Sequence, residues 1–161
     1  MNKIEKEMCP FCRTKNLTLI EEEKEVPSFG KVYVLTMKCS DCDCDKKDIM
    51  FEEEQKPCKL MFVINSEKDL KVKIIYSAEA TIKLPQLRLN IPANSGCICN
   101  IGDILDQFEK QLEEERDATE DQSDKKSFRN SLKKLRKIKF GDISTKLVIE
   151  DPSGNSVILD K

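Results

Sequence analysis

The segments CPFC (residues 9–12) and KCSDCDC (residues 38–44) carry five of the eight cysteines in this chain of 161 residues. In each segment two residues separate the cysteines of a pair, and 26 residues lie between the two pairs. Two intervening residues form a tight turn that directs both sulfurs at one ion. Histidine is absent, so thiolates must supply such a site. The spacing therefore predicts a zinc ribbon in which one zinc ion is bound by Cys9, Cys12, Cys39 and Cys42.

The segment between the two pairs has the pattern of a β-hairpin. The runs LTLIEEEKEV (17–26) and KVYVLTMKC (31–39) favour strands, and PSFG (27–30) between them predicts a turn. Such a hairpin brings the two cysteine pairs together. Four thiolates leave no open coordination position, so the ion is expected to be structural and to supply most of the folding free energy of so small a unit. The alternatives are buried thiols that coincide in spacing, or a redox pair.

The remaining cysteines are less informative. Cys44 competes with Cys42 for the fourth position, but one intervening residue fits the turn less well than two, so Cys42 is favoured. We expect Cys58 to be a buried or half-buried thiol. Cys97 and Cys99 have the spacing of a second metal pair or a redox dithiol, yet no partner pair remains for them. Free thiols are therefore the favoured interpretation.

The rest of the chain is rich in short β-type runs interrupted by turn residues, a pattern typical of a sandwich or barrel. We expect strands within 59–65, 70–84, 87–91, 144–150 and 156–160. DPSGN (151–155) predicts a hairpin turn between the last two runs, with Gly154 at positive φ. The predicted organisation is a zinc ribbon over residues 1–50 and a mainly β domain over residues 51–161.

Two amphipathic helices are predicted at about residues 100–140, inserted between strands of the second domain. Asn100 and Ser123 are candidate N-caps, and FGD (140–142) is a candidate stop. The apolar residues at helical spacing are Ile101, Ile104, Leu105, Phe108 and Leu112, followed after a polar gap by Phe128, Leu132, Leu135 and Ile138.

Charge is segregated along these helices, although the net charge of the chain is only −2. Residues 106–124 are mostly acidic and residues 125–139 are mostly basic. The basic run has the charge to contact RNA phosphates, but its cations alternate with the apolar stripe and no aromatic platform interleaves with them. A solvated helix face that complements the acidic helix is the favoured interpretation. If this face binds a partner, a protein is expected before a nucleic acid.

Composition favours a folded cytoplasmic protein that is not an enzyme. Hydrophobic residues make up 39% of the chain, yet no run approaches the roughly 18 to 20 apolar residues of a membrane helix, and the N-terminus lacks the apolar core of a secretory signal. Without histidine there is no Ser-His-Asp or Cys-His arrangement, and no glycine-rich phosphate loop is present. A turn accounts for DPSGN without catalysis.

Four stretches of the sequence resemble the ZPR-type zinc-finger family, and together they extend over nearly the whole chain. They are KEVPSFGKVYVLTMKCSDCDCDKKDIMF (24–51), ATIKLPQLRLNIPA (80–93), NIGDILDQFEKQL (100–112) and IEDPSGNSVI (149–158). The last is the most specific of them outside the cysteines. The pattern is present once, whereas eukaryotic members carry two copies, so the resemblance implies an archaeal type of member.

This resemblance implies a four-cysteine zinc ribbon beside a double-stranded β-helix, or jelly-roll-like, domain with an inserted α-helical hairpin. Eukaryotic members bind translation elongation factor 1-alpha and assist its folding. We therefore expect a zinc-binding protein-interaction module that binds or chaperones an elongation factor of this type. The alternatives are a nucleic-acid-binding zinc ribbon in translation or transcription, and a structural module of a larger complex.

Overall fold

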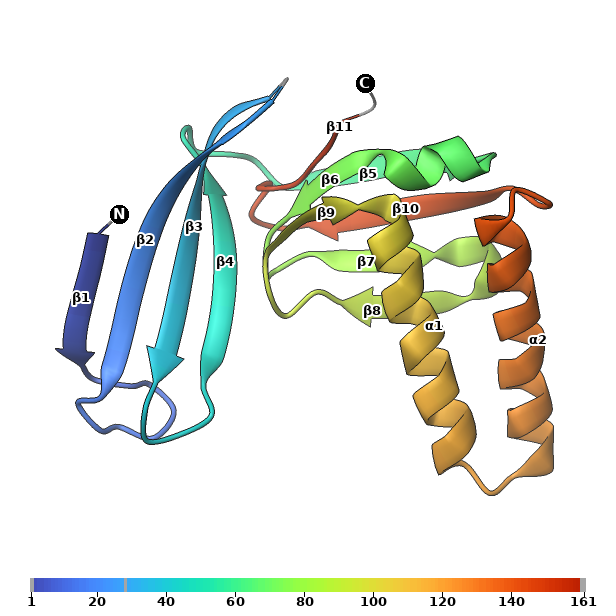
Figure 1. The fold of residues 1–161 in the computed structure, drawn as a ribbon, viewed down its shortest axis with the longest axis horizontal. Coiled ribbons are helices and arrows are strands. Elements are labelled where there is room, and N and C mark those ends of the chain that lie inside the picture. Colours follow the sequence, from blue (N-terminus) through green and yellow to red (C-terminus); the bar gives the residue numbers. More distant parts are fainter. Residues whose placement is uncertain (1, 28, 160–161) are drawn as a thin grey trace.

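The computed structural model describes residues 2–27 and 29–159, which form two β lobes and a helical hairpin (Figure 1). The first lobe is one antiparallel sheet in the order β1-β2-β3-β4. Its strands are β1 (Asn2–Glu7), β2 (Leu17–Val26), β3 (Gly30–Cys39) and β4 (Asp45–Phe51). The predicted hairpin is confirmed as β2 and β3, with Ser28 of its turn outside the described residues.

The second lobe is a jelly roll built from two antiparallel sheets. The four-stranded sheet contains β5 (Cys58–Ile64), β10 (Thr145–Asp151), β7 (Thr81–Leu84) and β8 (Leu89–Pro92) in that order. The three-stranded sheet contains β11 (Val157–Leu159), β6 (Lys73–Tyr76) and β9 (Cys97–Asn100). Two 3₁₀ helices, η1 (Glu67–Lys71) and η2 (Pro85–Leu87), precede β6 and β8. The mainly β fold with a jelly-roll domain is thus confirmed.

Three strands were not anticipated from the sequence: β1, β4 and β9. β1 is exposed along its whole length, and β4 has only Ile49 fully buried, so neither has the apolar alternation that marks a strand. They form because the β2–β3 hairpin offers two free edges. β9 is a short strand in a segment where the sequence pattern indicated only two cysteines, interpreted as free thiols. The predicted last strand reaches Asp160, which lies outside the described residues.

The two predicted helices are confirmed as α1 (Ile101–Ala118) and α2 (Gln122–Lys139), which lie between β9 and β10. Asn100 caps α1 as expected. The N-cap of α2 is Asp121 and not Ser123: its carboxylate accepts from the backbone N–H groups of Ser123 and Asp124, at 2.8 and 3.4 Å. An aspartate two residues earlier can reach both free N–H groups, which Ser123 inside the helix cannot. Neither helix is long and apolar enough to cross a membrane.

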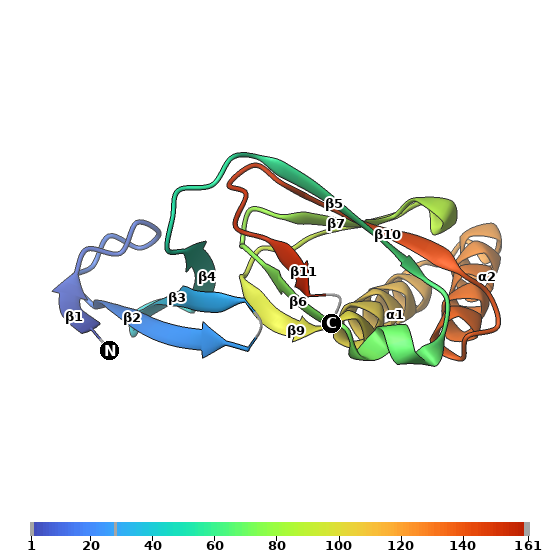
Figure 2. The same cartoon turned by 90° about the horizontal axis from the view of Figure 1, so that it is seen from above.

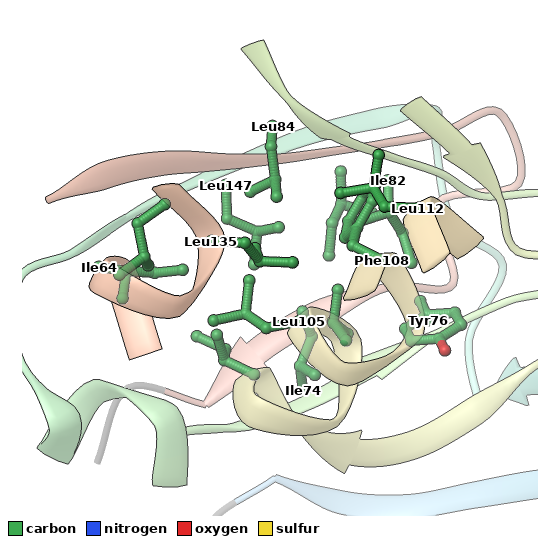
Figure 3. Packing of buried hydrophobic residues seen from close by; sticks show 14 of the residues in the cluster. Ile64, Ile74, Tyr76, Ile82, Leu84, Leu105, Phe108, Leu112, Leu135 and Leu147 are labelled. Atoms are coloured by element: carbon green, nitrogen blue, oxygen red, sulfur yellow. The ribbon is translucent and has the colours of Figure 1, made fainter. Parts of the chain in front are cut away.

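The apolar stripes of the helices pack into the jelly roll and form its core (Figure 3). Phe108, Leu112 and Leu135 meet side chains from both sheets, including Ile74 and Ile82. All four stripe positions predicted for α2 belong to this cluster, Phe128 at its margin. Ion pairs also join the two helices. Arg136 of α2 lies 3.6 Å from Glu109 and 3.4 Å from Glu113 of α1. Lys139 of α2 pairs with Asp106 and Glu109 of α1.

A second, smaller core joins the two lobes. Val26, Val32 and Ile49 of the first sheet pack with Ile75 of β6. Two hydrogen bonds reinforce this contact. The Gly96 amide donates to the Lys47 carbonyl at 2.7 Å, and the Ala78 amide donates to the Asp48 side-chain carboxylate at 2.9 Å. A Cβ at Gly96 would lie 2.8 Å from the backbone nitrogen of Ile49, so glycine permits this close approach. The far end of the hairpin is therefore anchored on the jelly roll (Figure 2).

The DPSGN segment forms the predicted turn but not a hairpin. Gly154 has φ +76° and donates to the Asp151 carbonyl at 3.1 Å, as a β-turn requires. However, β10 pairs with β5 and β7, whereas β11 pairs with β6 in the other sheet. The turn is therefore a corner between sheets. A hairpin turn and a corner between sheets use the same turn residues, so the sequence of this segment could not distinguish the two.

The side chain of Asp151 is the centre of this corner. It is buried, and its carboxylate accepts from the hydroxyls of Ser77 (2.7 Å), Ser153 (2.7 Å) and Ser156 (2.5 Å) and from the Ser153 amide (2.8 Å). Burial raises the pKa of Asp151, but the hydrogen bonds from Ser156, Ser153 and Ser77 outweigh it, and the net pKa is lowered. An ionised carboxylate therefore ties β10 to the segments after β6 and before β11.

Gly154→Ala is expected to destabilise the protein by about 3 kcal/mol or more, because the new Cβ would lie 2.0 Å from the Lys56 carbonyl oxygen. Gly141→Ala is a matched control: its φ is +80°, but the nearest atom to a new Cβ is 3.5 Å away. The free energy of unfolding of this control should fall by only about 1 kcal/mol, which is the cost of placing alanine in the left-handed region. Urea unfolding measures both, and equal losses would contradict the steric argument.

Asp151→Asn should lower the free energy of unfolding by about 2 kcal/mol at neutral pH, since it replaces charge-assisted hydrogen bonds. Because the folded-state pKa is lowered, the unfolded chain takes up the proton first as pH falls. The stabilisation is complete above the unfolded pKa of about 3.9 and is lost as pH falls through the lower folded value. Unfolding measured from pH 7 to 3 should show the difference between wild type and variant shrinking below about pH 4. A constant difference would refute this.

Candidate metal centre

Four cysteine sulfurs meet at the end of the first lobe that points away from the inter-lobe contact. Cys9 and Cys12 lie in the turn between β1 and β2, Cys39 ends β3, and Cys42 lies in the turn between β3 and β4. All four Sγ atoms are within 4.8 Å of one another. The distances are 3.7 Å for Cys9 to Cys42 and 3.5 Å for Cys12 to Cys39. The structure thus brings together all four residues that the spacing singled out.

The strand register explains why the two turns meet. β2 and β3 pair without interruption over ten residue pairs, from Val26 opposite Gly30 to Leu17 opposite Cys39. The exit of the first turn therefore lies beside the entry of the second. Ser40 donates to the Asn16 carbonyl at 3.2 Å, and the Asn16 amide donates to the Asp41 carboxylate at 2.5 Å. These bonds join the two turns directly.

Each turn is closed by its own backbone hydrogen bonds. In the first turn, Arg13 donates to the Cys9 carbonyl at 2.8 Å and Cys9 donates to the Thr14 carbonyl at 2.9 Å. Arg13 has φ +60°, so the chain reverses in the left-handed region just after the second cysteine. In the second turn, Cys39 donates to the Cys44 carbonyl at 3.0 Å. Both turns therefore hold their sulfurs on the same side.

The electrostatics of the cluster favour a cation. The hydroxyl and backbone of Thr14 lower the pKa of the Cys12 thiol to about 6, and the hydroxyl oxygen lies 3.1 Å from the Cys12 sulfur. At Cys42 the Cys44 backbone favours the thiolate, but burial and the three neighbouring sulfurs outweigh it and raise the pKa of Cys42 to about 12. Four adjacent thiolates repel one another, so the fully ionised cluster needs a positive charge among them.

The donor set and its dimensions fit zinc. A tetrahedral ion with Zn–S bonds of about 2.3 Å places its sulfurs about 3.8 Å apart. The observed separations of 3.5 and 3.7 Å are close to this value. The Cys9 side chain is fully buried and the other three are half-buried. The cluster of Cys9, Cys12, Cys39 and Cys42 can therefore hold a zinc ion.

The remaining cysteines lie outside the four-sulfur cluster. Cys44 contributes its backbone carbonyl to the second turn, and Cys58 is half-buried on β5. Cys97 and Cys99 point to the same face of β9 and pack at the margin of the jelly-roll core. The pKa of Cys97 is lowered to about 7, chiefly by a hydrogen bond from Cys99. Burial raises this pKa, but the hydrogen bonds from Cys99 and Tyr76 together outweigh it. Within the described residues, neither belongs to a metal-binding group of three or more.

Two exposed apolar residues lie in the first cysteine turn and a third lies on β1, and none of them was predicted from the sequence. Met8 and Phe11 flank Cys9 and are 59% and 58% exposed, and Ile4 on β1 is 53% exposed. Lys46 lies over the Phe11 ring, 4.7 Å from its centroid. The signal was present in the sequence, because large apolar residues within a tight turn have no core to enter.

The fold and this site define a protein with a four-cysteine ribbon beside a jelly roll. Residues 68–161 match the family model described as the ZPR1 jelly-roll domain. The chain therefore belongs to the ZPR1 family, whose curated members include proteins named as zinc-finger proteins.

Two similar proteins are archaeal and one is from fission yeast. An uncharacterized ZPR1-like protein of Pyrococcus horikoshii is 31% identical over 94% of this chain and 71% of its own length. Another, of Methanocaldococcus jannaschii, is 28% identical over 99% of this chain and 82% of its own length. The zinc finger chaperone zpr1 of Schizosaccharomyces pombe is 23% identical over 83% of this chain, but only 30% of its own length is covered. The archaeal matches agree with the type of member expected from the sequence.

Proposed function

We propose that Cys9, Cys12, Cys39 and Cys42 bind one structural zinc ion per chain. The convergence of the four sulfurs is the observation that carries this proposal. Four thiolates complete a tetrahedral shell, so no position remains for a substrate or an activated water. The ion would hold the two turns together at the end of the sheet that the jelly roll does not support.

The zinc ribbon and the jelly roll together would form a module that binds another protein and has no catalytic role of its own. The fission yeast relative is named a chaperone, and a chaperone needs exposed apolar surface for an incompletely folded client. The ribbon offers such surface at Ile4, Met8 and Phe11.

We place the division between the two lobes near residue 50, as the sequence predicted.

A groove on the first sheet extends this apolar surface. Its volume is about 410 Å³, and its floor includes Ile4, Leu19, Leu35 and Met37 from three adjacent strands. Strand register places Ile4, Leu19 and Met37 in one row across the sheet. An apolar row of this kind suits an apolar protein segment better than a phosphate backbone.

The client we propose is a translation elongation factor of the 1-alpha type in the cytoplasm. The support is the resemblance of the sequence to the ZPR-type family, together with the membership in that family established above. The zinc-dependent ribbon end would contact the factor, and the helical hairpin would provide a second, charged surface.

One observation favours the alternative of nucleic acid binding. Within the described residues, only Arg136 and Lys139 of the basic helix α2 form ion pairs. Lys133, Lys134 and Lys137 are exposed cations on the same helix. If they bind RNA, affinity will fall steeply with salt and reversal of these three charges to glutamate will abolish it. Binding that survives this change would exclude the alternative site.

Zinc analysis of freshly purified protein should give one ion per chain, and Co²⁺ exchanged into the site should show the absorption of a tetrathiolate centre. Cys39→Ser should lose the metal, whereas Cys58→Ser, outside the cluster, should keep it. On metal removal, hydrogen exchange should accelerate in residues 9–16 and 39–44 while the jelly-roll core stays protected, because that core has its own packing. Full metal content in Cys39→Ser would refute the ligand assignment.

Affinity capture from a cell extract, with the zinc-loaded chain as bait, should enrich the elongation factor. Phe11→Ala should reduce this binding by about tenfold, since a large exposed aromatic is a typical interface anchor. Met61→Ala is the matched control: Met61 is 58% exposed, as Phe11 is, but lies on β5 of the jelly roll, outside both proposed contact surfaces. Its loss should leave binding unchanged. Capture that never enriches the factor, or equal effects of both variants, would count against the proposal.

A further inference from the structure

A polar hollow lies between the η2 segment and one face of α2, in the jelly-roll lobe and remote from the cysteine cluster. Its volume is about 390 Å³. From α2 it is lined by a single helical stripe with spacing i, i+3, i+4, i+7, namely Ser127, Asn130, Ser131 and Lys134. From the η2 segment it is lined by Gln86, Leu87 and Arg88. Two separate elements thus contribute polar side chains to one space.

The lining is dominated by hydrogen-bond donors and positive charge. Arg88 and Lys134 supply a guanidinium and an ammonium group, and Ser127 and Ser131 supply hydroxyls. The side-chain oxygen Oε1 of Gln86 already accepts from the Thr145 hydroxyl at 2.9 Å and from the Lys146 backbone amide at 2.8 Å. Its NH₂ group is therefore the part of the side chain left for another partner.

Neither cation of the hollow is neutralised by the protein. In the part of the chain that the structure describes, no carboxylate lines the hollow, and neither Arg88 nor Lys134 takes part in an ion pair. This contrasts with Arg136 and Lys139 on the opposite side of α2, which are paired with acidic residues of α1. Two cations held at one hollow without a counter-charge favour an anionic ligand.

The backbone of Arg88 offers a way to test the side chain without disturbing the turn. Arg88 follows η2 in the left-handed region, with φ +56° and ψ +37°. Glycine or asparagine adopts this conformation at lower cost, so an arginine there is strained. Lys6, Arg13 and Asn94 have similar φ values, so the conformation by itself indicates no ligand. It does mean that Arg88→Gly removes the guanidinium and relieves the backbone at the same time.

We propose that this hollow binds a phosphate group. A planar guanidinium, an ammonium and two hydroxyls match the oxygens of a phosphate, with Arg88 as the bidentate partner and Lys134 as the point charge. The ligand is either inorganic phosphate or the phosphate of a small organic ester, and the hollow is large enough for either. This site is remote from the zinc cluster, and its test does not involve an elongation factor.

The test is a titration of the ¹⁵N-labelled, zinc-loaded full chain, followed by heteronuclear NMR. Inorganic phosphate and glycerol 3-phosphate are the probes, with sodium chloride at equal ionic strength as the reference. Saturable shifts are expected for backbone amides at 86–88 and 127–134. Arg88→Gly and Lys134→Ala should each weaken binding about tenfold or more. Lys133→Ala, a neighbouring cation outside the hollow, should bind as wild type does.

Arg88→Gly also distinguishes a loss of phosphate binding from a loss of folding stability. Because glycine relieves the left-handed strain, the melting temperature of this variant should stay unchanged or rise while phosphate binding is lost. Tighter binding of the ester would identify an organic phosphate as the ligand, and equal binding would identify the free ion. Shifts that chloride reproduces, or wild-type affinity in both Arg88→Gly and Lys134→Ala, would overturn the proposal.

Discussion

The pairing of β2 with β3 is the constraint on which the architecture of the first lobe depends. Ten consecutive residue pairs place Cys39 opposite Leu17 at one end and Gly30 opposite Val26 at the other. One end thus assembles the sulfur cluster, and the other delivers Val26 and Val32 to the core shared with the jelly roll. A shift by one residue would turn every side chain to the opposite face and would undo both ends together.

The two ends of this sheet are stabilised by different physics. At the jelly-roll end, apolar burial and the backbone bonds of Gly96 and Ala78 suffice. At the cysteine end the apolar side chains Met8 and Phe11 are exposed, so burial cannot hold the turns together. Metal ligation by the four cysteines would stabilise this end without a core, and the apolar side chains would then remain available to a partner. This links the proposed structural role of the cluster to the proposed binding role.

Sequence reasoning succeeded where a local pattern determines the structure. Cysteine spacing identified the four converging residues, and the period of 3.6 identified both helices with their buried stripes. It failed where the determining interaction is remote. β1 and β4 are strands because β2 and β3 present edges, and the turn at Asp151 is a corner because β11 finds its partner in β6. Likewise, the hollow at Arg88 requires two segments about 40 residues apart, which no local window relates.

The segregation of charge along the helical hairpin has a structural explanation that covers only one side of α2. The side facing α1 uses Arg136 and Lys139 to neutralise Asp106, Glu109 and Glu113, so the sign change in the sequence becomes attraction between antiparallel neighbours. That pairing accounts for two of the cations of the basic run. Lys134 lies on another side of α2, where it lines one hollow together with Arg88. The α1 pairing does not account for these two cations, and a bound anion would give them the counter-charge that the described lining residues do not supply.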